Sequence, residues 1–243
     1  MPPTYQQMYD QADLVAIAQP IATNTTPEQM LLPNISPDIP VAGVETQFAV
    51  QTLLKGDKAA TTRFILHHYR EVKHVNYMNA PELVAFQPTN REPFLVFVKK
   101  EADGRFAPIY NQTDPGMAGI ESMRIIDLIA IAKPVTPKIQ TDKKMLPGVT
   151  PVVQLMGYQT EFAVTEVLAG DPTTKRIVLH HYERLSDYQC IQIDFQPDTE
   201  RLYLLILKKD AQGQYGPISR FGVSGAETMP TGFSIIQLPH SRQ

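Results

Sequence analysis

An internal repeat constrains the fold of this chain more than any other feature. Residues 48–57 read Phe-Ala-Val-Gln-Thr-Leu-Leu-Lys-Gly-Asp, and residues 162–171 read Phe-Ala-Val-Thr-Glu-Val-Leu-Ala-Gly-Asp. In both copies a short polar turn follows, and then a run that ends in His-His-Tyr, at residues 63–69 and 176–182. Runs rich in β-branched and aromatic residues on either side of a Gly-Asp turn predict a β-hairpin. We therefore expect the same strand–turn–strand unit twice.

The repeat begins upstream of this hairpin. Residues 13–20 and 127–134 are identical at six of eight positions, and each apolar run is closed by proline. Short runs rich in Val and Ile predict buried strands. The proline-containing segments that follow, which end at residues 33 and 147, are predicted to be irregular connections because proline cannot donate a ladder hydrogen bond.

A second hairpin is predicted downstream in each copy. The first copy has an apolar run at 93–100, Asp-Gly at 103–104 and a return run at 105–109. The second copy has matching runs at 202–209 and 214–218. Asp-Gly between apolar runs is a strong hairpin signal. Each copy therefore offers about five strands.

Five strands and two hairpins per copy predict a mainly β protein. We expect two tandem five-stranded β-barrels of the oligonucleotide/oligosaccharide-binding type, with a β-sandwich as the second choice. The two domains are predicted at residues 1–123 and 124–243. The segment 71–85 is longer than its counterpart 183–194, which is typical of surface loops.

Charge and cysteine content narrow the range of functions. The net charge is −3, without the basic surplus that nucleic-acid binding or an anionic membrane surface requires. Cys190 is the single cysteine, which excludes an intrachain disulfide and any Cys-x-x-Cys motif. No apolar run reaches the ~20 residues of a membrane helix, and no signal peptide is visible at the start of the sequence.

Three runs, at residues 13–18, 48–57 and 94–108, carry a resemblance to known proteins. They resemble uncharacterised, often exported bacterial proteins with a duplicated β-barrel module. More distantly, the layout resembles the netrin-like module of tissue inhibitors of metalloproteinases. The resemblance covers nearly the whole chain twice, and it implies a barrel fold, export to the periplasm or medium, and protein binding. Those inhibitors chelate the protease zinc through an N-terminal cysteine, which residues 11–13 lack, so their mechanism is not implied.

The His-His-Tyr ends of the two hairpins are the candidate ligand-binding residues. Histidine is the commonest metal ligand, but neighbouring strand residues point to opposite faces, so each pair is expected to split. A metal site would need one histidine from each copy. Alternatively, one histidine of each pair fills a half-buried position and the other is solvated. The candidates are His67, His68, Tyr69, His180, His181 and Tyr182.

No catalytic motif accompanies these residues: Gly-x-Ser-x-Gly, His-Glu-x-x-His and phosphate-binding loops are absent from the sequence. We therefore expect a non-enzymatic binding protein without a cofactor. It would present loops such as residues 71–85 to a protein partner, in the periplasm or outside the cell. Two alternatives stay open: a metal-binding protein that uses the histidine pairs, and a hydrolase-type enzyme with its site in a cleft between the copies.

Overall fold

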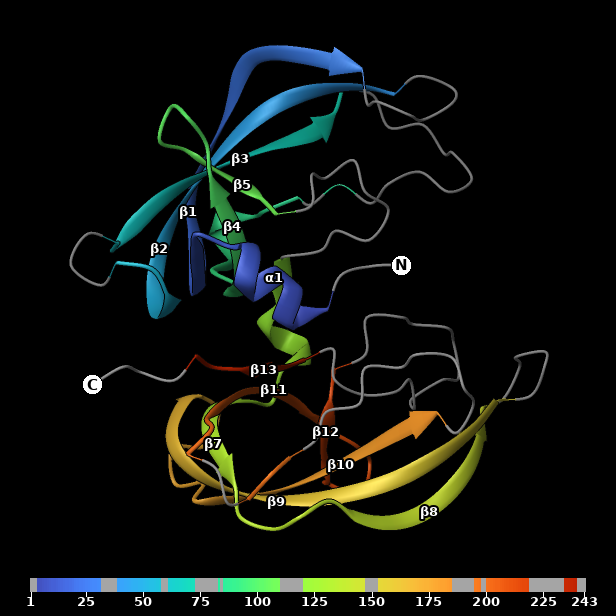
Figure 1. The fold of residues 1–243 in the computed structure, drawn as a ribbon. Coiled ribbons are helices and arrows are strands. Elements are labelled where there is room, and N and C mark those ends of the chain that lie inside the picture. The colour runs from blue at the N-terminus through green and yellow to red at the C-terminus, as the bar shows by residue number, and fades with distance from the viewer. Residues whose placement is uncertain are drawn as a thin grey trace. The chain divides into compact units, whose positions relative to one another are not determined.

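The computed structural model describes ten segments of the chain (Figure 1). They are residues 4–31, 39–57, 61–72, 83, 85–109, 120–146, 153–184, 195–197, 200–218 and 234–239. The protein is mainly β, as predicted. It forms two compact units: unit 1 contains Gln7–Met123, and unit 2 contains Arg124–Gln243 together with Thr4–Gln6.

Unit 1 is a closed five-stranded barrel. Its strands are β1 (Leu14–Leu31), β2 (Pro40–Lys55), β3 (Arg63–Glu71), β4 (Phe94–Lys100) and β5 (Phe106–Pro108). They pair in the order β1-β2-β3-β5-β4, and β4 returns to β1. Only the β3–β5 pair is parallel within this barrel. This is the order of an oligonucleotide/oligosaccharide-binding barrel, and a short strand β6 (Ile120–Ser122) adds to β4.

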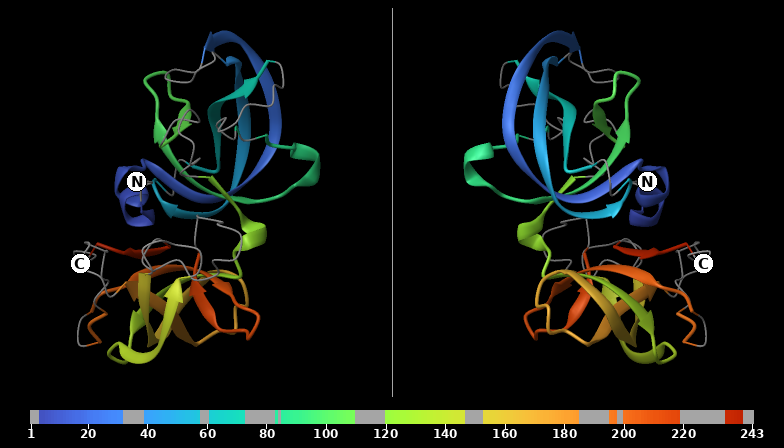
Figure 2. Two further views of the ribbon diagram at one scale, coloured as in Figure 1. Left: turned by 90° about the vertical axis from the view of Figure 1, so that its right-hand side faces the viewer. Right: turned by 90° about the vertical axis from the view of Figure 1, so that its left-hand side faces the viewer.

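Unit 2 repeats this barrel with one strand divided (Figures 1 and 2). Its strands are β7 (Leu128–Pro134), β8 (Ile139–Leu146), β9 (Val153–Ala169), β10 (Arg176–Arg184), β11 (Tyr203–Lys209), β12 (Tyr215–Pro217) and β13 (Ile235–Gln237). Strands β7 and β8 both pair with β9 and together take the place of β1. Strand β7 closes the barrel on β11, and β13 adds to β11 as β6 adds to β4.

The prediction of irregular connections after the first strand is wrong in unit 1, and in unit 2 it holds only for residues 135–138, which precede β8. Strand β1 continues through Pro20 and Pro27 to Leu31. Both prolines fall at register shifts of the β1–β2 ladder, where no ladder hydrogen bond is required from them. In addition, β4 pairs with β1 only from Leu14 to Ala18. The second half of β1, which contains both prolines, is therefore hydrogen-bonded on one side, to β2.

Each unit has its own hydrophobic core, made of residues that point into the barrel. In unit 1, Phe48 stacks on Phe64, with ring centroids 5.2 Å apart, and its edge meets Phe86 at 5.0 Å. In unit 2, Phe162 meets Phe195 at 5.0 Å. The alternation predicted from the sequence therefore holds in both barrels.

The helices of the described segments are short. They are α1 (Tyr5–Gln11) and two 3-10 turns, Pro88–Asn90 and Met123–Ile125. Lys55 at the end of β2 donates from Nζ to the carbonyl oxygens of Tyr9 and Asp10, at 2.6 and 3.2 Å, and so binds the last turn of α1. Within the described segments, no helix has the length and apolar character to cross a membrane.

Candidate functional site

The structure splits each histidine pair between the two faces of its strand, as predicted. On β3, Leu66 and His68 point into the barrel, whereas His67 and Tyr69 lie on the outer face. The expectation that one histidine of each pair is solvated is wrong in unit 1, because His67 is only 6% exposed. Other side chains of unit 1 cover it on the outer face.

His68 and His181 are core residues. His68 Nε2 lies 2.8 Å from the Thr46 hydroxyl, and its ring meets Phe86 edge-on at 5.0 Å. Burial, and to a lesser degree the neighbouring His67, lower the pKa of His68 to about 4, so it is neutral at pH 7. His181 is buried against the ring of Phe195, 5.6 Å away. These two predicted site residues therefore belong to the barrel interiors.

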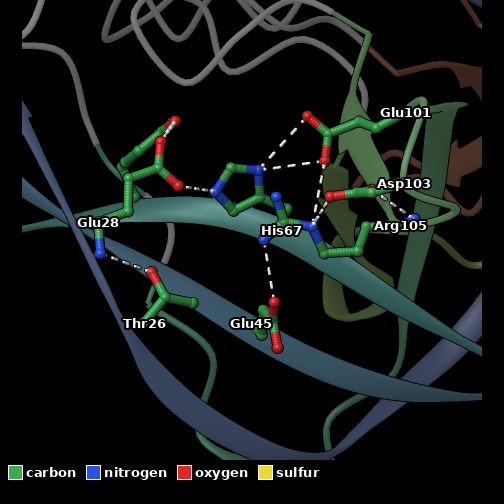
Figure 3. Close-up of polar contacts among 8 residues, drawn as sticks. Thr26, Glu28, Glu45, His67, Glu101, Asp103 and Arg105 are labelled. Carbon is green, nitrogen blue, oxygen red and sulfur yellow. Dashed lines mark hydrogen bonds and ion pairs between the residues drawn. The ribbon is translucent and has the colours of Figure 1, made fainter.

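His67 lies between two carboxylates from distant parts of unit 1 (Figure 3). Its Nε2 is 2.9 Å from Glu28 Oε2, and its Nδ1 is 3.1 Å from Glu101 Oε2. Glu28 comes from β1, and Glu101 follows the end of β4. A doubly protonated imidazole donates to both carboxylates at once, whereas a neutral ring donates to one.

Tyr69 completes this arrangement. Its hydroxyl donates to Glu28 Oε1 at 2.6 Å, and its ring centroid is 5.1 Å from that of His67. Burial, followed by the hydrogen bond and charge of Glu28, raises the pKa of Tyr69. The hydrogen bond from Tyr69, and then the charge of His67, lower the pKa of Glu28. Glu28 is therefore held as an anion and Tyr69 as a neutral donor. We call Glu28, His67 and Tyr69 the acid–histidine–tyrosine cluster.

A β-bulge brings Glu28 to this place. Thr26, Pro27 and Glu28 of β1 lie opposite Gly43 of β2, and Gly43 pairs in turn with Tyr69. A side chain at position 43 would collide with the Thr26 hydroxyl and come within 3.2 Å of Glu28 Oε2. The missing side chain lets the Glu28 carboxylate cross β2 and reach Tyr69.

The turn between β4 and β5 extends the cluster with an ion-pair network (Figure 3). Arg105 Nη1 donates to Glu45 Oε1 on β2 at 2.9 Å, and Arg105 Nε donates to Asp103 Oδ2 at 2.7 Å. The same Nε is 3.8 Å from Glu101 Oε2, so Arg105 and His67 share this carboxylate. The network joins the β4–β5 turn to the outer face of β2 and β3.

Unit 2 contains the same cluster at the equivalent positions. The Tyr182 hydroxyl donates to Asp142 Oδ2 at 3.0 Å, and His180 Nε2 is 3.6 Å from Asp142 Oδ1. The rings of His180 and Tyr182 are 5.0 Å apart. Here too the acid lies in a bulge opposite a glycine, Gly157, where a side chain would come within 2.7 Å of the Thr141 hydroxyl.

The surroundings of the two clusters differ in charge. Unit 2 has Gln159, Gln212 and Gln214 where unit 1 has Glu45, Asp103 and Arg105. Unit 2 also carries lysines next to its cluster. The ammonium group of Lys144 lies 4.6 Å from the ring centroid of Tyr182, and that of Lys138 lies 4.3 Å from Tyr158. Among the described residues, carboxylates therefore outnumber basic side chains around the cluster of unit 1, whereas lysines offset the acids around the cluster of unit 2.

Sequence reasoning missed the acid and the glycine of each cluster. Glu28 and Asp142 are separated by 114 residues, and so are Gly43 and Gly157. This is the spacing of the repeat itself, so a search for polar residues and glycines that recur at that spacing would have found both. The prolines around Glu28 conceal it, because they predict an irregular connection where the structure has strand β1.

Among the segments that the structure describes, no group of three or more His, Cys, Asp or Glu side chains is arranged to hold a metal ion. No protein-family model, curated protein or solved structure matches this chain. The duplicated barrel expected from the resemblance is confirmed by the fold. Kinship with exported bacterial proteins or netrin-like modules stays a prediction.

Proposed function

We propose that this protein is a non-enzymatic binding protein that acts outside the cytoplasm and binds a protein partner through unit 1. The binding surface, which we call the acidic face, consists of Glu28, Glu45, His67, Tyr69, Glu101, Asp103 and Arg105. One observation carries the proposal: these side chains come from β1, β2, β3 and the β4–β5 turn. Barrels of this topology bind oligonucleotides and oligosaccharides on the face of strands 2 and 3 and on that turn, and we infer that a protein partner uses the same face here.

The charge of the acidic face favours a partner with basic side chains. Its carboxylates are reachable, since the side chains of Glu28, Glu45, Glu101 and Asp103 are 32–51% exposed. The four carboxylates outnumber the two basic side chains of the face, Arg105 and His67, so the acidic face carries an excess of negative charge. Such a surface attracts basic protein segments and repels the phosphates of nucleic acids.

The polar groups of the face are organised for recognition more than for chemistry. The raised pKa of Tyr69 keeps its hydroxyl protonated, and Glu28 is occupied by Tyr69 and His67. A location outside the cytoplasm rests on the resemblance of the repeat, not on the site. The predicted contact through residues 71–85 also belongs to the proposal, and 73–82 and 84 lie outside the described segments.

Cross-linking in the native cells tests this proposal. The tagged full-length chain would be compared with the variant Glu45→Gln/Glu101→Gln, and cross-linked proteins would be identified by mass spectrometry. The matched control, Glu161→Gln/Glu166→Gln, removes two carboxylates from β9 of unit 2. We expect a dominant partner, cross-linked through β2, β3 or the β4–β5 turn, to be lost in the unit 1 variant and retained in the control.

Two results would contradict the proposal. One is a partner that is cross-linked only through unit 2 and is unaffected by Glu45→Gln/Glu101→Gln. The other is a blank result with abundant, folded protein in the cells. Circular dichroism of each purified variant distinguishes loss of binding from loss of fold.

A further inference from the structure

Strand β8 is an edge strand in the described part of unit 2. It pairs with β9 on one side and stands at the end of the strand order β10-β12-β11-β7-β9-β8. The backbone N–H and C=O groups on the other side of an edge strand are a template for a further strand. Proteins that bind peptides by strand addition use such edges.

The side chains of β8 are unusually exposed to solvent for a strand that contains apolar residues. All residues from 139 to 145 are exposed, and Ile139 and Met145 reach 57% and 59%. The strand contains no proline between its first and last residue. Strands with exposed apolar side chains and a free, proline-free edge are suited to pairing with another chain.

The equivalent half of β1 in unit 1 has a proline within the strand and differs in charge. Residues 21–31 contain Pro27 and a single charged residue, Glu28. Residues 135–145 of unit 2 keep the acid of the cluster and add three lysines, at positions 138, 143 and 144. Because unit 1 forms the same cluster without any lysine in this stretch, these cations are not required for the fold.

We propose that β8 binds an extended acidic segment of another protein by strand addition. The exposed Lys143 attracts a carboxylate of the added strand, whereas the ammonium group of Lys144 is directed across β9 to Tyr182. Met145 shares a face of β8 with Lys143 and Ile139 lies on the opposite face, so each contacts apolar residues on its own face of the added strand. A second copy of this chain is a poorer occupant. Residues 135–145 carry three lysines against one acid, so pairing of two copies would bring together two segments of the same net charge. This inference concerns unit 2 and is independent of the acidic face.

Fluorescence anisotropy with designed peptides tests the inference on the full chain. The probe is a labelled eight-residue peptide that alternates Glu and Val. The comparison peptides replace Glu by Lys, or carry N-methyl groups on the amides of one edge. We expect the acidic peptide to bind, the basic peptide not to bind, and N-methylation to weaken binding by at least about tenfold because it removes backbone donors.

A pair of variants with the same change in charge locates the binding edge. Lys143→Gln in unit 2 and Gln29→Glu in unit 1 each lower the net charge by one at equivalent strand positions. We expect Lys143→Gln to weaken binding of the acidic peptide about threefold, as for a single exposed charge, and Gln29→Glu to leave it unchanged. Both sites are exposed, so both variants are expected to fold.

Several results would overturn the inference. Equal binding of the N-methylated peptide would mean attraction by charge without strand addition. Equal weakening by Gln29→Glu would place the peptide elsewhere or make the effect nonspecific. Absence of binding at low salt would also reject it. A dimer in sedimentation experiments that Lys143→Gln strengthens would identify a second copy as the occupant instead.

Discussion

The carboxylate of Glu28 occupies the space that a side chain at position 43 would need. Glu28 Oε2 lies within 3.2 Å of the place where a Cβ on Gly43 would stand. The acid crosses the neighbouring strand there and accepts the hydrogen bond of Tyr69 on the strand beyond. A glycine and a bulge on adjacent strands therefore define which polar groups meet on the outer face of unit 1.

Gly43→Ala is expected to destabilise unit 1 by about 1–3 kcal/mol, the usual range for overpacking. The added methyl group would collide with the Thr26 hydroxyl and crowd Glu28. Urea unfolding followed by circular dichroism measures the change. In a Thr26→Ala background the cost of Gly43→Ala should fall, because the closest clashing atom is gone. Equal costs in both backgrounds would argue against this packing.

Tyr69→Phe is expected to destabilise unit 1 by about 1–3 kcal/mol, since it leaves a carboxylate without its short hydrogen bond. The pKa of Tyr69 is raised in the folded state, so its contribution is fully present below the ordinary value of 10.0 and is lost as pH rises above it. Unfolding measured from pH 8 to 11 should therefore show a steeper loss in the wild type than in Tyr69→Phe.

The equivalent change in unit 2, Tyr182→Phe, provides the comparison. Its hydrogen bond to Asp142 is longer, at 3.0 Å against 2.6 Å for Tyr69. We expect a smaller loss of stability on its removal. A larger loss of stability in Tyr182→Phe than in Tyr69→Phe would show that hydrogen-bond length does not determine which cluster stabilises its unit more.

His68 should make unit 1 sensitive to acid. Its pKa is about 4 in the folded protein against an ordinary value of 6.5, so the unfolded chain binds the proton more readily. Its contribution is fully present above pH 6.5 and is lost progressively as pH falls from there through 4, up to about 3 kcal/mol. An NMR titration of the His68 ring gives the pKa directly. His68→Leu should flatten the stability curve between pH 4 and 6.5; an unchanged slope would assign the effect to other groups.

The ion pair between Arg105 and Glu45 should contribute little to stability. Both side chains are partly exposed, so a double-mutant cycle with Arg105→Gln and Glu45→Gln is expected to give a coupling of about 1 kcal/mol or less. The coupling should shrink in 1 M NaCl because salt screens it. The pair Arg176–Glu161 of unit 2, with Arg176 mostly exposed, should give a smaller value. A coupling well above this range would indicate that the network has a structural role.

The fold could be predicted from the sequence because it is indicated by two local signals, the period-two alternation of the strands and the glycines of the turns. Period-two alternation in residues such as Phe64 and Leu66 places one face of β3 in the core. Turn glycines mark the hairpins: Gly56 and Gly170 adopt φ of 128° and 104°, which side chains disfavour. The same alternation predicts that His67 and His68 lie on opposite faces of β3, as they do in the structure.

The polar cluster could not be predicted in the same way, because its members are distant in sequence. Glu28, His67 and Glu101 meet only once three strands have acquired their register, and a bulge determines which side chain of β1 faces β2. Proline predicts irregular chain, although a strand that is hydrogen-bonded on one side tolerates it at a bulge. Burial of His67 likewise depends on the β4–β5 turn.

The short strand added to each barrel shows a limit of matching the repeat. In unit 1 it is β6 (Ile120–Ser122), which pairs with β4, and in unit 2 it is β13 (Ile235–Gln237), which pairs with β11. Three-residue strands carry too little pattern to be placed by similarity alone.

Each barrel fills its interior with residues of its own half of the chain. Two copies with separate cores can share their buried positions and still differ in what they offer to a partner. Both units have the acid–histidine–tyrosine cluster, but the charged Glu45, Asp103 and Arg105 around it in unit 1 correspond to neutral glutamines in unit 2.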